Sequence, residues 1–308
     1  MITPNFVNAI HDYCDEIGWH EIWWISDIFF LFTGVLANTA LLWLFLQERK
    51  PLSASQVLGV NVVVMDLIYL SIMPIRLFFD AKMMKEENKT RQDFSLTGPH
   101  DNVTNPWETA TDVFKIFNLI GCPLLLSCMC IERYLAVIKP VLYLKVRKWE
   151  YRMAVSAVVW VITLSFCMAS AIVEDMTVMM APVSITVSCL FILMLACLCS
   201  MIWSLMQQSP AHTTLGNQAC SEPPLKRQAV CNVLVVVVPA VISYLPVLPM
   251  VPLLVYIQYR KALGIEVCNV FELSELFPRF GVFIGPLFYL SRARKMCCLV
   301  SFKPSRKK

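Results

Sequence analysis

Long apolar segments separated by short charged breaks dominate this sequence. Six of them are at least as long as the roughly 20 residues that a helix needs to cross a bilayer, at residues 22–46, 57–79, 113–137, 153–173, 182–206 and 230–257. A seventh is weaker, because its uninterrupted apolar stretch covers only residues 280–290 and follows Glu272, Glu275 and Arg279. Its charged half can be helical if it faces the bundle interior. The pattern predicts an all-α, seven-transmembrane helix bundle over residues 22–290.

The composition favours a membrane protein over a soluble domain. Of the 308 residues, 57% are hydrophobic and 16% are charged, whereas roughly 25% of a soluble domain is charged. Mean hydropathy is +0.62. One water-soluble core cannot bury so much apolar surface, so we expect lipid to surround the bundle. Residues 1–21 and 291–308 remain as terminal segments, and we expect no second domain.

The distribution of basic residues predicts the orientation of the bundle. Residues 1–21 contain four acidic residues and no Lys or Arg, whereas residues 291–308 contain seven basic residues and no acid. The links after the first, third and fifth segments are also basic, and the last contains Lys226 and Arg227. Cytoplasmic loops are rich in Lys and Arg. We therefore expect a membrane protein with its N-terminus outside and its C-terminus inside, and we do not interpret the charge as nucleic-acid binding.

Two kinds of modification site fit this orientation. Asn88 and Asn102 each begin an Asn-x-Thr glycosylation sequon, and both lie in the link between the second and third segments, on the expected outer side. After Leu290, the chain is typical of a short basic amphipathic helix on the inner leaflet. Cys297 and Cys298 stand where S-palmitoylation is chemically sensible, the alternative being two unmodified thiols.

A Glu-Arg pair marks the cytoplasmic end of the third segment. Charged groups at a membrane edge are costly unless they are paired. Glu132 would hold the Arg133 guanidinium in a resting state and release it toward a partner, and the alternative is a snorkelling arginine beside an acid.

Glu132, Arg133 and Tyr134 resemble the Asp/Glu-Arg-Tyr motif of rhodopsin-like (class A) G-protein-coupled receptors. Other segments match this family in order, over about residues 34–298. The matching residues are Gly34, Asn38, Asn61, Asp66, Pro74, Trp160, Tyr244, Pro246, Pro286 and Tyr289. The resemblance implies a receptor that transmits an extracellular signal to a heterotrimeric G protein. It also implies that the sixth span pivots near Pro246 and that Arg133, Lys226 and Arg227 meet the G protein.

Several family positions are occupied by other residues. Gly285 precedes Pro286 where the family has Asn or Asp, and Tyr244 replaces a more common Trp or Phe. Glu108 aligns with the usual disulfide cysteine at the top of the third span, and the outer loop at residues 174–181 lacks the partner cysteine. Some family members join the N-terminus to the third outer loop. By that resemblance we expect a Cys14–Cys268 bridge, the alternative being two free thiols.

The resemblance also implies a sodium site at Asp66, with Asn38 and Asn118 as neighbours. Gly285 and Gly281 supply no side-chain oxygen, however, and Cys122 stands at a usual Ser. These departures argue against sodium coordination, and a protonated or water-bound Asp66 is the alternative. We expect no other cofactor.

Charged residues in the outer half of the bundle predict the ligand site. We expect Arg76, Asp112, Lys115, Glu275 and Arg279 to face it, together with Tyr244. Lys115 aligns with the family's common counter-ion position, where a cation disfavours amine ligands. With Arg76 and Arg279 it could clamp a carboxylate or phosphate. The alternative is internal pairing of Asp112 with Lys115 and of Glu275 with Arg279.

One further position indicates a branch of the family, and two other functions remain as alternatives. Arg76 follows Pro74 by two residues, and this spacing resembles that in the branch of nucleotide, lysolipid and protease-activated receptors. The resemblance to this branch favours an anionic ligand. Enzyme motifs are missing from the sequence, so we expect no enzyme. One alternative is an atypical, scavenging or constitutively active receptor. Another is a transporter or channel, although the sequence shows no repeated half.

Overall fold

The computed structural model describes residues 20–47, 54–92, 106–146, 148–173, 176–207, 239–248, 268–270, 276–287 and 290. Their regular structure is helical. The labelled elements are α2 (His20–Gln47), α3 (Ala54–Gln92), α4 (Pro106–Ile138), α5 (Pro140–Val146), α6 (Trp149–Val173), α7 (Met176–Gln207) and the 3-10 helix η1 (Leu245–Val247). Further helical pieces lie at residues 239–244 and Leu276–Leu287. The predicted all-α fold is confirmed.

Five helices in the described part of the chain are long and apolar enough to cross a membrane. Their spans are Trp24–Gln47, Gln56–Phe79, Thr109–Ile138, Trp149–Val173 and Ala181–Ser204. These agree with the first five segments predicted from hydropathy, so the chain is a multi-pass membrane protein. The predicted sixth and seventh spans are described only in part, at residues 239–248 and Leu276–Leu287.

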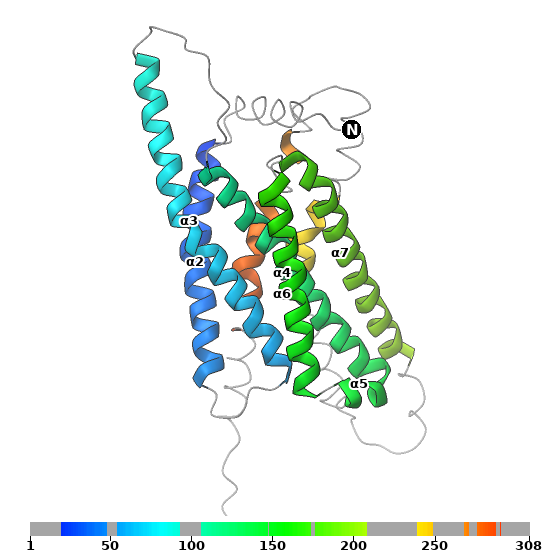
Figure 1. Ribbon diagram of the computed structural model, residues 1–308. Helices are drawn as coiled ribbons and strands as arrows, with labels where there is room; N and C mark the ends of the chain where they lie inside the picture. Colours follow the sequence, from blue (N-terminus) through cyan, green and yellow to red (C-terminus); the bar gives the residue numbers. More distant parts are fainter. Residues whose placement is uncertain are drawn as a thin grey trace, which may run out of the picture.

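Helix α4 occupies the centre of the bundle. It packs against α3, α6 and α7, and it runs obliquely across the bundle in Figure 1. The most apolar part of α4 is 61% buried, whereas the corresponding parts of the other four spans are 28–33% buried. Because other helices surround α4, its side chains contact neighbours on several sides. Residues of this one span can therefore take part in polar contacts near both of its ends.

The apolar residues divide into an inward and an outward set. Met65, Ile120 and Leu125 are fully buried between α3 and α4 and their neighbours. Leu36, Trp43 and Ile172 are 68–74% exposed on the outer faces of α2 and α6. Large side chains exposed in this way are expected where lipid, rather than water, surrounds the helices.

Helix α3 is longer than the predicted second span. Its 39 residues correspond to about 58 Å at about 1.5 Å per residue, well beyond the roughly 30 Å hydrocarbon layer. The apolar part ends at Phe79, and the polar remainder projects past the bundle (Figure 1). The first sequon residue, Asn88, therefore lies in a helical extension of α3. Its glycosylation remains a prediction.

Candidate functional site

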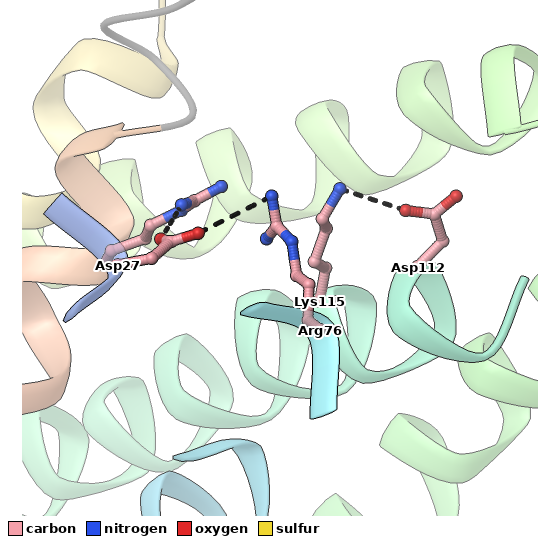
Figure 2. A network of polar contacts seen from close by, with 5 residues as sticks. Asp27, Arg76, Asp112 and Lys115 are labelled. Carbon is pink, nitrogen blue, oxygen red and sulfur yellow. Dashed lines mark hydrogen bonds and ion pairs between the residues drawn. The ribbon is translucent and has the colours of Figure 1, made fainter. Parts of the chain in front are cut away.

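A buried carboxylate joins three helices near one end of the bundle. Asp27 of α2 is 3% exposed, and its Oδ1 accepts a hydrogen bond from Nη1 of Arg279, on the helix Leu276–Leu287. Its Oδ2 lies 3.7 Å from Nη2 of Arg76 on α3 (Figure 2). An isolated charge in this position would be strongly unfavourable. The two guanidiniums compensate it, and the ion pair with Arg279 ties α2 to a segment 252 residues away.

A second ion pair lies on α4. Lys115 Nζ is 3.0 Å from Asp112 Oδ1, and both side chains are about one-third exposed, at 31% and 30%. Figure 2 shows Lys115 and Arg76 extending in the same direction from their helices, which pack against each other as α4 and α3. An i,i+3 pair of this kind contributes only about 0.2–0.5 kcal/mol, so a competing charge can replace it at small cost.

Four of the predicted ligand residues form ion pairs in the structure, in two separate groups, and one of the groups contains Asp27, which was not predicted. Arg76 and Arg279 converge on Asp27, and Lys115 pairs with Asp112 as the internal-pairing alternative predicted. Tyr244 instead belongs to a deeper cavity, and Glu275 lies outside the described residues. Asp27 was missed because it belongs to no motif. A lone acid inside an apolar span was the signal that could have found it.

Asp66 forms a separate polar centre, deeper in the bundle. Its Oδ1 accepts hydrogen bonds from Asn118 Nδ2 at 3.0 Å and from the Cys122 thiol at 3.3 Å. These residues line a cavity of about 40 Å³ together with Ser243 and Tyr244. A volume of that size accommodates ordered water.

Two of the contacts to Asp66 differ from those of a typical sodium site, and the absence of sodium coordination stays a prediction. Small hard cations prefer several oxygen ligands, yet Asn118 turns its amide nitrogen to Asp66 and Cys122 offers sulfur. A side chain at Gly281 would place its Cβ 3.0 Å from Ser243 Oγ, so close packing excludes a larger donor there. Asn38 Nδ2 donates to the carbonyls of Gly34 and Val282, whereas its Oδ1 is buried with no hydrogen-bond partner among the described residues.

The Glu-Arg motif near the end of α4 has a partner that the sequence did not indicate. Arg152 Nη2 donates to Glu132 Oε1 at 2.6 Å, and the two side chains are 5% and 11% exposed. We expected Glu132 to hold Arg133, whereas the ion pair recorded for Glu132 joins α4 to α6. The reason is that α6 begins at Trp149, before the predicted start at residue 153. Arg152 thus lies on a buried helix face and not in a loop.

The described motif residues of the other spans make contacts within the helix bundle. Trp160 Nε1 donates to Asn61 Oδ1 at 2.9 Å, which links α6 to α3. Pro246 lies in η1, where the α-helix that ends at Tyr244 becomes a 3-10 turn. Pro286 lines the Asp66 cavity, and Tyr134 packs against the main core. A pivot at Pro246 and the roles of these residues in activation remain predictions.

Several predicted sites involve residues outside the described part of the chain. These are Cys14, Asn102, Lys226, Arg227, Glu275, Tyr289, Cys297 and Cys298. Cys268 is buried and disulfide-bonded. Its partner is not among the described residues, so the pairing with Cys14 remains a prediction. The described residues contain no cluster of His, Cys, Asp and Glu suited to a metal ion.

Comparison with known proteins points to one class of receptor. The chain is 27% identical over 153 residues to the human uracil nucleotide/cysteinyl leukotriene receptor, covering 49% of this chain and 37% of the receptor. It is 27% identical over 144 residues to the rat 2-oxoglutarate receptor 1, covering 46% and 37%. It is 24% identical over 147 residues to a purinoceptor of Gallus gallus, covering 47% and 36%. No family model matches the chain.

The matched segment spans less than half the length of these curated relatives. Their names nevertheless describe receptors, and the third-span, second-span and fourth-span motifs of this chain sit at helix contacts in the described bundle. The chain is therefore a multi-pass helical membrane protein similar to rhodopsin-like receptors of the nucleotide and lipid branch, as its sequence motifs predicted.

Proposed function

We propose that this chain is a G-protein-coupled receptor of the plasma membrane that responds to a small anionic ligand from outside. The observation that carries the proposal is that Arg76 and Arg279, from two helices, meet at Asp27, while Lys115 of α4 extends in the same direction as Arg76 (Figure 2). The acids paired with them in the described part of the chain are Asp27 and Asp112. A site with such a composition attracts carboxylates and phosphates and repels amines.

The names of the relatives support this class of ligand. Uracil nucleotides carry phosphates and 2-oxoglutarate carries two carboxylates, and both appear in the names of proteins similar to this chain. The ligand would enter between α2, α3, α4 and the helix Leu276–Leu287. A ligand that binds one bundle arrangement better than another shifts the population toward it.

The cytoplasmic end would transmit that shift. Arg133 lies near the end of α4, which ends at Ile138, and follows Glu132 of the α4–α6 contact. With the basic tail inside, as the Lys and Arg distribution predicts, Arg133 and the Lys226–Arg227 pair would face the G protein. The sixth span would open the cleft by pivoting near Pro246.

The test uses a panel of small anions and amines on cells that express the receptor with a promiscuous G protein. Nucleotide exchange on the G protein is expected with one or more carboxylates or phosphates. Arg133→Ala should abolish this exchange while an outer epitope tag shows normal surface expression. A response to amines alone, or undiminished exchange by the Arg133→Ala receptor, would contradict the proposal.

A constitutively active or atypical receptor is the second candidate, and one contact favours it. Glu132 is engaged by Arg152, so the acid that would restrain Arg133 has another partner. Ligand-independent exchange is then expected to be high. It should fall in Arg152→Gln, because that substitution leaves Arg133 as the neighbouring cation for Glu132. Low basal exchange that is the same in both proteins would exclude this candidate.

A further inference from the structure

Asp27 has two roles in the proposed ligand site: it connects helices, and it contacts the arginines that would bind the ligand. It lies three residues inside the span that begins at Trp24, or about 4.5 Å at about 1.5 Å per residue. Its side chain is nevertheless 4% exposed, enclosed by the two arginines. A carboxylate placed against two guanidiniums has the same chemistry as the anion that the proposed site would bind.

The two arginines differ in how they hold Asp27. Arg279 Nη1 donates a direct hydrogen bond to Asp27 Oδ1, and the side chain of Arg279 is 8% exposed. Arg76 is 3.7 Å from Oδ2, and its side chain is 22% exposed. Exposure then rises to 31% at Lys115. The contact that an incoming anion reaches most easily is therefore the looser one, between Arg76 and Asp27, while the tighter contact with Arg279 stays buried.

We propose that Asp27 is a built-in competitor for the ligand, occupying the Arg76 guanidinium until a carboxylate or phosphate oxygen replaces it there. Arg279 keeps Asp27 in place through its hydrogen bond when Arg76 turns to the ligand. Lys115, which has its own exchangeable partner in Asp112, supplies the second cation. This inference rests on the proposed function, and it makes Asp27 a residue that sets anion affinity without touching the ligand.

The competition has a consequence that net charge alone does not predict. Replacing Asp27 and Arg279 together by Asn and Gln removes one negative and one positive charge, so the formal charge of the cluster is unchanged. The competitor of Arg76 is nevertheless gone. If Asp27 competes with the ligand, the double variant binds anions more tightly. If Arg279 is a direct ligand contact, the same variant binds them less tightly.

The experiment measures anion binding to the purified receptor in lipid nanodiscs, by thermal stabilisation with inorganic phosphate and with succinate. Asp27→Asn/Arg279→Gln is expected to raise the apparent affinity for these probes about twofold to fivefold over the unsubstituted protein, in line with the modest strength of a partly exposed ion pair. Arg76→Gln is expected to weaken it, and adding Arg76→Gln to the double variant should remove the gain.

An unchanged or reduced affinity in Asp27→Asn/Arg279→Gln would overturn the inference. Asp27→Asn alone serves as a second variant, with the same direction expected and a stability loss because Arg279 loses this carboxylate. These readouts are independent of coupling to a G protein. A receptor whose double variant gains phosphate or succinate affinity, but which never promotes nucleotide exchange, would support the competitor role and contradict the proposed function.

Discussion

Replacing Arg152 by glutamine is expected to loosen the contact between α4 and α6, because Glu132 would lose the guanidinium that pairs with it. The guanidinium and carboxylate atoms are 2.6 Å apart, with side chains 5% and 11% exposed. Removing one member of a buried pair typically costs about 3–5 kcal/mol. Glu132 lies near the helix end and next to Arg133, which can partly compensate it, so we expect a loss of about 2–3 kcal/mol.

The matched variant removes both charges. Glu132→Gln/Arg152→Gln leaves no unpaired ion of this pair, so its loss is expected to be about 1 kcal/mol or less. A double-mutant cycle should then show a coupling energy of at least about 1–2 kcal/mol, and more if Glu132→Gln alone is also destabilising. Lys148→Gln removes an exposed cation four residues earlier and should leave stability within about 0.5 kcal/mol.

The assay is thermal unfolding of the purified protein in one detergent at one scan rate, since membrane proteins seldom unfold reversibly. At about 2 °C per kcal/mol for a chain of this size, Arg152→Gln should lower Tm by about 4–6 °C. A double variant that loses the sum of the two single effects would refute the reasoning, because it would show that the charges contribute independently.

Three further predictions concern helix contacts and the disulfide. Gly121→Ala should lower Tm by several degrees, because a Cβ there would lie 2.6 Å from the Met65 sulfur. The control Gly285→Ala should leave Tm almost unchanged, because a Cβ there would have nothing within 4 Å. Equal losses of Tm in the two variants would contradict the close α3–α4 packing. Asn38→Ala removes a 2.7 Å hydrogen bond to the Val282 carbonyl and should cost about 1–3 kcal/mol, against little change for Thr33→Ala, whose hydroxyl bonds within its own helix. Cys14→Ser and Cys268→Ser should lower Tm equally, with no further loss in the double variant; a normal Cys14→Ser receptor would mean that Cys268 has another partner.

The local pattern of the sequence was enough to predict the first five membrane-spanning helices. Apolar runs longer than about 20 residues need to be helical in lipid, because every backbone polar group must find a partner within its own segment. The first five spans follow this rule closely. The motifs at Asp66 and at Glu132 also fell on helices that face the bundle, and Asn118 was correctly expected next to Asp66.

The partners of the charged side chains depended on how the helices pack. Sequence spacing predicts contacts only within one helix, and it found the Asp112–Lys115 pair. Asp27 and Arg279 are 252 residues apart, and Arg152 reaches Glu132 only because α6 begins early and turns that face toward α4. The rotation and start of each helix are set by side-chain packing across the whole bundle, and a change of one residue in helix phase turns a side chain by about 100°. Hydropathy is insensitive to such a rotation, so these ion pairs became visible only in three dimensions.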